Sequence, residues 1–183
     1  DLGSRIDKSA VIKQNVRIEG PVVIEKGVKI FEGTKIVGPV YIGKNTIIGN
    51  NNIIRSSSIG SDCVTGFNSD ITRSVIGNNC WFHTNYVGDS VILNNVSMGS
   101  GTVTANLRLD DGKIVSMVKE EKLGTGRNKL GALIGDNVRV GVQVSTMPAV
   151  KIGSNSFIAA GIVLTHDIPA GSFVKPVSVG FVV

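Results

Sequence analysis

Isoleucine returns at every sixth position at the start of the chain, from Ile6 to Ile54. A helix repeats every 3.6 residues and a strand every 2, so a period of six fits neither element alone. The fifth and first residues of neighbouring units lie two apart and face the same way in an extended segment, whereas Gly, Asn, Asp and Ser between them suit turns. The pattern therefore predicts short strands joined by sharp turns, three to a coil, stacked into a triangular prism of parallel β-structure.

The repeat runs on after Ile54 with one-residue slips, stops after Thr104, and resumes from Ile134 to Leu164. Its 24 units, taken three to a coil, predict about eight coils. We expect one domain over residues 1–183, with regular coils at 6–106 and 134–168 and an inserted loop at 107–133.

The fifth position of each unit is expected to face inward, and small or β-branched residues such as Ser58 and Val75 fill it, with Tyr86 as an unusual occupant. Cys63 and Cys80 share this position one coil apart, so we expect two buried thiols stacked inside the prism rather than a disulfide. Such thiols favour a cytoplasmic protein.

Composition narrows the function classes. Only 18% of the 183 residues are charged and 5% are aromatic, which indicates an aliphatic core. No apolar run is long enough to span a membrane, no signal peptide is recognisable, and the start at Asp1 in repeat register is expected of an excised domain. The net charge of +5 is scattered without aromatic residues nearby, so nucleic-acid binding is not expected, while anionic small molecules remain compatible.

The pattern is broken in two places. One is the segment His83-Thr84-Asn85-Tyr86-Val87-Gly88-Asp89, where two successive units have five residues and the His83 ring is expected to point outward. The other is the insertion at 107–133, which carries six basic residues. A long loop on a rigid scaffold commonly carries function.

These two segments resemble those of a known protein family. The His83 segment and the later Gly99-Ser100-Gly101-Thr102-Val103-Thr104-Ala105-Asn106 resemble the acetyltransferase domain of the bifunctional N-acetylglucosamine-1-phosphate uridyltransferase / glucosamine-1-phosphate acetyltransferase family. The insertion, ending Gly126-Arg127-Asn128-Lys129, is more similar to the archaeal sugar-1-phosphate nucleotidylyltransferases with such a domain. The resemblance implies an all-β, left-handed parallel β-helix that assembles as a homotrimer with active sites in the grooves between subunits.

The resemblance also implies a reaction. An amino-sugar 1-phosphate, glucosamine 1-phosphate above all, is acetylated by acetyl-CoA, and the family's general base corresponds to His83. An imidazole can take up and release a proton near neutral pH, which suits that role. By the same resemblance Asn106 lies at the acetyl group and the amino sugar, and the backbone N–H of Ser100 stabilises the oxyanion.

Further positions follow the family pattern less closely. Tyr86 corresponds to a residue that binds the sugar phosphate, and Ser97 stands where the family has an Asn. The family's phosphate-binding Arg is best approximated by Arg55, and a family Lys of the loop by Lys113. A family Lys on the coil that precedes the His83 coil falls at or near Thr72, with Arg73 adjacent. These departures leave glucosamine and galactosamine phosphates both open.

The segment Ala159-Ala160-Gly161 matches the family's CoA groove. Arg127 and Lys129 either contact CoA phosphates or a neighbouring subunit, or simply keep the loop soluble. His166, Lys151 and Lys175 are expected on the surface, and no metal is expected for acetyl transfer.

Three functions compete. The first is this N-acetyltransferase, as the C-terminal part of a bifunctional enzyme of UDP-N-acetylglucosamine synthesis. The second is a non-catalytic trimerisation or regulatory β-helix of a sugar nucleotidylyltransferase, which would have no need of His83, Tyr86 and Asn106. The third, a metalloenzyme like the γ-class carbonic anhydrases, needs three His ligands, and the chain has two His.

Overall fold

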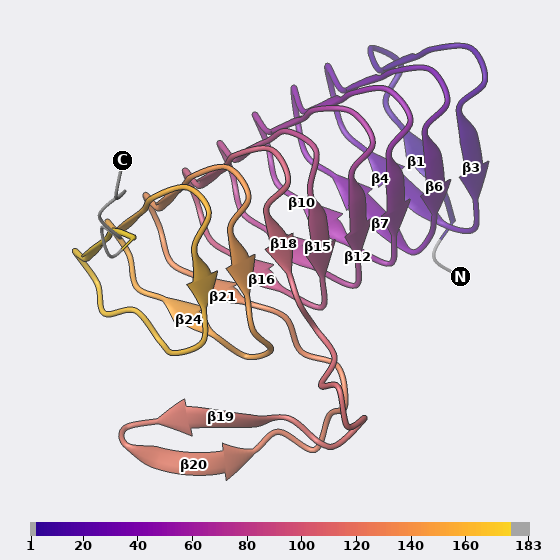
Figure 1. Ribbon diagram of the computed structural model, residues 1–183. Helices are drawn as coiled ribbons and strands as arrows, with labels where there is room; N and C mark the ends of the chain where they lie inside the picture. The colour runs from indigo at the N-terminus through magenta and orange to yellow at the C-terminus, as the bar shows by residue number, and fades with distance from the viewer. Residues whose placement is uncertain (1–2, 177–183) are drawn as a thin grey trace, which may run out of the picture.

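The computed structural model describes residues 3–176, which form an all-β, left-handed parallel β-helix with three sheets as its faces (Figure 1). The first sheet consists of β1 (Arg5–Ile6), β4 (Val22–Ile24), β7 (Val40–Ile42), β10 (Ser58–Ile59), β13 (Val75–Ile76), β16 (Val91–Ile92), β21 (Leu133–Ile134) and β24 (Lys151–Ile152). The parallel β-prism predicted from the hexad and the left hand implied by the family resemblance are thus confirmed.

The other two faces follow the same stacking. The second sheet consists of β2 (Val11–Ile12), β5 (Lys29–Ile30), β8 (Ile47–Ile48), β11 (Val64–Thr65), β14 (Trp81–Phe82), β17 (Ser97–Met98), β22 (Arg139–Val140), β25 (Phe157–Ile158) and β27 (Phe173–Val174). The third sheet consists of β3 (Arg17–Glu19), β6 (Lys35–Val37), β9 (Ile53–Arg55), β12 (Asp70–Thr72), β15 (Tyr86–Gly88), β18 (Val103–Thr104), β23 (Ser145–Thr146) and β26 (Val163–Leu164).

The faces hold eight, nine and eight strands, so the helix has about nine turns rather than the eight expected. The difference lies at the C-terminal end, where the repeat continues past Leu164. Ile168 bridges Ile152, and β27 adds a ninth strand to the second sheet. His166 therefore does not lie near the end of the last coil.

The core consists mainly of the first residues of the repeat units, here called unit heads, which stack along the axis of the prism. Asparagine occupies many of the corners between the strands. Among the unit heads, the side chains of Ile30, Ile36, Ile42 and Ile48 are fully buried. Ile48 lies directly above Ile30, one coil further along the second sheet. At the corners eight Asn residues adopt φ between 53° and 60°, namely Asn15, Asn45, Asn51, Asn68, Asn79, Asn95, Asn137 and Asn155. Asn tolerates this left-handed conformation because its short polar side chain can hydrogen-bond locally.

The expected inward position was wrong in the five-residue units. Ser74 is 1% exposed, whereas Val75 is 54% exposed, and likewise Ser57 rather than Ser58 is buried. The inward residue is the one two places before the next unit head, since side chains alternate along a strand. In the unit that begins at Phe82 that residue is Asn85, so Tyr86 does not fill the core.

The two cysteines behave as expected. Both are free and buried, and the N–H of Cys80 donates to Sγ of Cys63 at 3.4 Å. Each thiol donates in turn to a backbone carbonyl of the next coil, Cys63 to Gly77 and Cys80 to Leu93.

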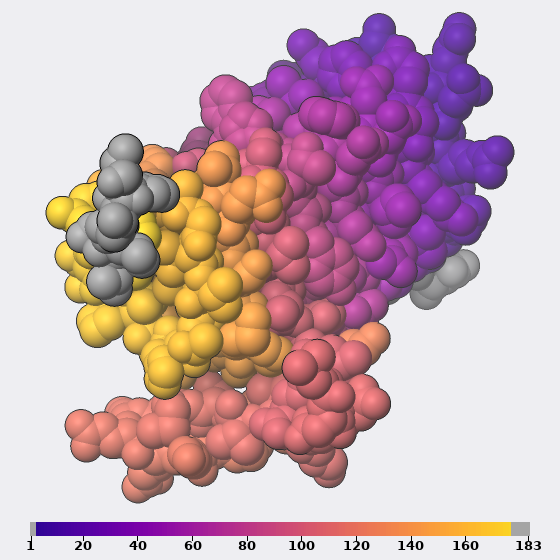
Figure 2. All heavy atoms as spheres, viewed as in Figure 1, coloured from indigo at the N-terminus to yellow at the C-terminus, as the bar shows by residue number. Residues whose placement is uncertain are grey.

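The insertion leaves the prism between β18 and β21 as an antiparallel hairpin, β19 (Val115–Val118) paired with β20 (Glu121–Gly124). We call residues 107–131 the arm; Figure 2 shows it as a lobe beside the C-terminal coils. Lys151 was expected to be a solvated surface residue, but it holds the arm against the prism. Its Nζ donates to Oγ of Ser116 at 3.2 Å and to the carbonyl of Met117. The same Nζ pairs with Asp167 at 2.7 Å. In the part of the chain described here, no helix qualifies as a membrane span.

Candidate active site

His83 lies at the corner where the second sheet turns into the third. The unit heads Thr65, Phe82, Met98, Val140 and Ile158 stack in register. The residues that follow them therefore form one row along this corner, and His83, Gly99 and Ala159 are members of it. Ala159 is three coils from His83, or about 14 Å at ~4.8 Å per coil. One edge of the prism thus aligns the predicted base, the predicted oxyanion turn and the predicted CoA segment.

The backbone of His83 is fixed from inside the prism. Its N–H donates to Oδ1 of the buried Asn85 at 2.8 Å, and its carbonyl accepts from Oγ of Ser69 at 2.8 Å. Asn85 Nδ2 donates in turn to the carbonyls of Gly99 and Thr102 at 2.8 and 3.1 Å. The side chain of His83, in contrast, is exposed. The main chain of His83 is therefore held in place while its ring remains accessible.

A groove of about 410 Å³ lies beside the ring. Its lining includes Trp81 and Ser97, which neighbour each other in register, and Arg139 on the next coil. Arg139 donates to Oδ1 of Asn95 at 2.9 Å and to its carbonyl, so the guanidinium is held against the wall. The predicted contact residue Ser97 therefore shares a groove with His83, whereas Arg139 was missed because no motif marks it.

Ser100 stands at the exposed tip of the turn one coil after His83. Gly101 N–H donates to the carbonyl of Thr84 at 2.8 Å, and the carbonyl of Ser100 accepts from Gln143 N–H at 2.9 Å. Within residues 3–176 the N–H of Ser100 has no acceptor of its own. It can therefore donate to a ligand oxygen.

The CoA segment continues this corner. Ala160 and Gly161 are exposed, and Gly161 adopts φ of 72°. A Cβ on Gly141 would come within 2.6 Å of the nitrogen of Ala160, so the coils stack closely here. The small side chains leave the corner open along its length.

A second cluster lies at the opposite corner, where the third sheet turns into the first. Asn106 Nδ2 donates to Oη of Tyr86 at 3.1 Å and to Oδ2 of Asp89. Arg73 pairs with the same carboxylate in bidentate fashion, Nε and Nη2 each at 2.7 Å. Burial alone would raise the pKa of Asp89, but hydrogen bonds from Arg73 and Asn106 outweigh it and leave the pKa below its usual value.

Arg55 and Arg73 are both engaged by carboxylates. Arg55 donates through Nη2 to both oxygens of Asp70, at 3.0 and 2.8 Å, and it lies in register with Thr72, next to Arg73. These two predicted substrate-binding residues are thus neighbours, and each already has an acidic partner. Asp89 itself lies in the recognised motif but was assigned no role from the sequence, because its partners come from other coils.

The arm is rooted at this second corner. Leu130 N–H donates to the carbonyl of Asn106 at 2.9 Å, and Gly131 N–H to that of Asp89 at 2.8 Å. The charge of Lys129 also helps to lower the pKa of Asp89. Arg127 and Lys113 are exposed at the arm's base, where buried Ile114 bonds to the carbonyl of Arg127 through its N–H at 2.8 Å.

Within one chain the two groups stay apart. His83 precedes β15 and Asp89 follows it, so they occupy opposite corners of the third sheet, with Tyr86 on the strand between them. Among residues 3–176 no three His, Cys, Asp or Glu side chains gather as metal ligands.

Known proteins resemble this chain over nearly its whole length. A bifunctional protein GlmU of Methanococcus vannielii is 46% identical over 91% of the chain and 40% of its own length. A bifunctional sugar-1-phosphate nucleotidylyltransferase/acetyltransferase of Sulfurisphaera tokodaii is 42% identical over 90% of the chain and 41% of its own length. The chain thus spans about two fifths of the length of these relatives. No protein-family model matches it.

The solved structure of LpxA, a UDP-N-acetylglucosamine acyltransferase from Bacteroides fragilis, has the same fold. It superimposes with a TM-score of 0.60 at 20% identity, covering 91% of this chain and 69% of that one. The resemblance seen in the His83 and Asn106 motifs is therefore confirmed at the level of sequence, and the β-helix at the level of fold.

Proposed function

We propose, from the premise that this chain is homologous to a segment of the bifunctional GlmU proteins, that it is an acetyl-CoA-dependent N-acetyltransferase. The proposed acceptor is an amino-sugar 1-phosphate, with glucosamine 1-phosphate as the first candidate. The observation that carries the proposal is the corner row that aligns His83, the free N–H of Ser100 and the segment Ala159-Ala160-Gly161.

The chemistry would proceed by direct transfer. The sugar amine attacks the thioester carbon, and His83 accepts the proton that the amine loses as the C–N bond forms. The N–H of Ser100 donates to the oxyanion of the tetrahedral intermediate. Collapse breaks the C–S bond, and the thiolate of CoA recovers the proton from His83, which leaves the amide, CoA and neutral imidazole.

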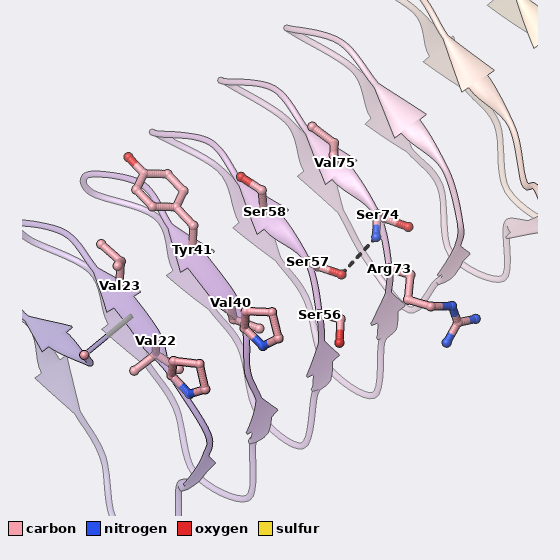
Figure 3. A pocket seen from close by; sticks show the side chains of 13 residues that line it. Val22, Val23, Val40, Tyr41, Ser56, Ser57, Ser58, Arg73, Ser74 and Val75 are labelled. Atoms are coloured by element: carbon pink, nitrogen blue, oxygen red, sulfur yellow. Dashed lines mark hydrogen bonds between the residues drawn. The ribbon is translucent and has the colours of Figure 1, made fainter. Parts of the chain in front are cut away.

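A homotrimer would complete the site. Exposed apolar side chains follow the first sheet through Tyr41, Val75 and Val91, and Figure 3 shows the groove of about 420 Å³ at its N-terminal end. The second sheet presents Trp81 beside Val64. In a closed threefold ring the first sheet of one protomer packs against the second sheet of the next.

That packing has a consequence for the site. It leaves the third sheet on the outside, and the His83 corner of one protomer meets the Asn106 corner of its neighbour. The groove between them would then hold Tyr86, Ser97 and Asn106 against the sugar, with Arg55 and Lys113 near the phosphate. Arg127 and Lys129, at the base of the arm, would stand beside the same groove and suit the phosphates of CoA.

The wider role is inferred from the relatives. Their names describe bifunctional proteins, so we propose that the chain acts with a sugar nucleotidylyltransferase in UDP-N-acetylglucosamine synthesis. The buried free thiols Cys63 and Cys80 support a cytoplasmic setting.

Acetylation of glucosamine 1-phosphate by acetyl-CoA tests the function, with wild type compared with His83→Ala. Loss of a general base is expected to lower kcat by about 100-fold or more. His166→Ala is the control, because His166 is the other exposed histidine and follows β26, three coils beyond His83, so its kcat should match that of wild type. Equal rates for both variants, or an inactive wild type with any amino-sugar phosphate, would instead support the non-catalytic scaffold.

A further inference from the structure

Asp89 is held more firmly than the other paired carboxylates. Its side chain is 10% exposed, against 31% for Asp70 in the Arg55 pair. Its backbone is fixed as well: Asp89 N–H donates to the carbonyl of Thr72 at 2.9 Å, and its own carbonyl accepts from Gly131 at 2.8 Å. The carboxylate is therefore a fixed point at the second corner.

The Asp89 carboxylate determines which atom of the Asn106 side-chain amide, Nδ2 or Oδ1, faces it. An ionised carboxylate only accepts hydrogen bonds, so the group that Asn106 turns toward Asp89 must be its NH₂. The same Nδ2 donates to Tyr86 Oη. Oδ1 of Asn106 then points away from both, and among residues 3–176 no donor reaches it.

The backbone makes room for this arrangement. A Cβ on Gly88 would lie 2.6 Å from Tyr86 Oη and 2.7 Å from Asn106 Nδ2. Arg73 lies at the rim of the apolar groove on the first sheet, and Figure 3 shows its guanidinium pointing away from the valines there. Its third donor, Nη1, is bonded to Oγ1 of Thr72 at 3.0 Å, so Nε, Nη1 and Nη2 are all engaged.

We propose that Asp89, braced by Arg73, is a positioning residue for acetyl transfer: it orients the Asn106 amide so that Oδ1 accepts an N–H of the substrate's amino group. Arg73 accordingly serves to hold Asp89 in place and does not itself bind the substrate. The inference rests on the proposed function. The lowered pKa of Asp89 keeps its carboxylate ionised at neutral pH, in the acceptor-only form that fixes the Asn106 amide.

A double-mutant cycle tests whether Asp89 acts through Asn106. Asp89→Asn keeps the shape but offers a donor as well as an acceptor, which lets the Asn106 amide turn over. We expect kcat for acetylation to fall about ten-fold or more, with KM for acetyl-CoA within about two-fold of wild type. In an Asn106→Ala background the same substitution should change kcat by less than about two-fold, because the group it positions is gone.

Two further variants test the role of Arg73 and provide a control remote from the site. Arg73→Lys retains the charge and loses the bidentate geometry, so a smaller loss of kcat in the same direction is expected. Glu25→Gln breaks the Arg5–Glu25 pair, 2.7 Å long and remote from the site, and should leave kcat unchanged. Thermal unfolding of each variant confirms that it is folded.

The outcomes are distinguishable. An active wild type whose Asp89→Asn variant keeps its kcat overturns the positioning role alone. Additive losses from Asp89→Asn and Asn106→Ala also overturn it, since they show that Asp89 acts by another route. An inactive wild type overturns the proposed function, and this role with it.

Discussion

The surroundings of His83 show how single residues build the candidate site. The buried amide of Asn85 holds the backbone of His83, and the paired carboxylate of Asp89 holds the side chain of Asn106. In both cases a fixed polar side chain holds its neighbour and leaves the neighbour's own functional group, the His83 ring or Asn106 Oδ1, without a partner inside the described chain.

Gly88→Ala is expected to lower acetylation about ten-fold or more, because the new methyl group would collide with Tyr86 Oη and Asn106 Nδ2. Steady-state rates with glucosamine 1-phosphate measure the effect. Gly124→Ala is the matched control, since nothing lies within 4 Å of a Cβ there. A Gly88→Ala enzyme as active as this control would contradict the packing described for the cluster.

Asp89 should make stability depend on pH in one direction. Its pKa is lower in the folded chain than its unfolded value near ~3.9, so its contribution is present above that pH and is lost as the pH falls through the folded pKa. Asp89→Asn is therefore expected to lower the free energy of unfolding at pH 7, with a smaller difference in strong acid. Urea unfolding at both values checks this, and a difference that grows toward acid would refute it.

At the scale of elements, unit length decides which side chains reach the surface. A five-residue unit shifts the inward position onto Ser57, Ser74 or Asn85, and the residue after it turns outward. At the corner before the third sheet, buried polar residues of units of either length bond from coil to coil: the N–H of Ser69 donates to Asn52, and the N–H of Asn85 donates to Ser69. The corner is therefore a continuous ladder, and a change in one coil is felt in the next.

Asn85→Ala is expected to destabilise the chain by about 1–3 kcal/mol, because it strands buried hydrogen-bonding groups of Gly99 and Thr102. It should also lower activity, because it releases the backbone of His83. Asn52→Ala makes a matched comparison two coils away, where Nδ2 bonds to the carbonyls of Gly49 and Gly66. We expect a similar loss of stability by chemical unfolding but normal kcat; equal losses of kcat would argue against a local effect at His83.

The arm should be released without unfolding the prism. Lys151→Met removes the contacts to Ser116, Met117 and Asp167, which are partly exposed and worth about 1 kcal/mol or less to the fold. Limited proteolysis should cut within 107–131 faster than in wild type, while the melting temperature changes little. Lys175→Met, on the surface outside the arm, is the control, and identical cleavage of both variants would show that Lys151 does not tether the arm.

At the scale of the whole molecule, the distribution of side chains over three faces implies how copies assemble. Val75 on the first sheet and Trp81 on the second are more than half exposed, whereas the third sheet presents charged residues such as Arg17, Lys35 and Asp70. The third sheet also exposes Ile53 and Val163, so the faces differ in degree, and the two faces richer in exposed apolar side chains suit a ring in which each subunit has two neighbours.

Glutamates on the first sheet should break that ring. Val75→Glu with Val91→Glu would bury two charges in the proposed interface, so light scattering should report a monomer where wild type is a trimer. Activity should fall with the trimer, because each site would lack its second corner. Val163→Glu, an equally exposed valine on the third sheet, should remain trimeric. A wild type that is monomeric and active would refute this assembly.

The repeat by itself determined the β-helix, the interruption after Thr104 and the position of the His83 and Asn106 motifs, because each coil is stabilised mainly by its immediate neighbours and so leaves a local period in the sequence. Only the tertiary structure decided that Tyr86 lies outside the core, that Arg73 is bound to Asp89, that Lys151 holds the arm, and that the helix has about nine turns. These features depend on side chains of different coils meeting across one or more turns. The repeat period in the sequence does not indicate which side chains of different coils are in contact.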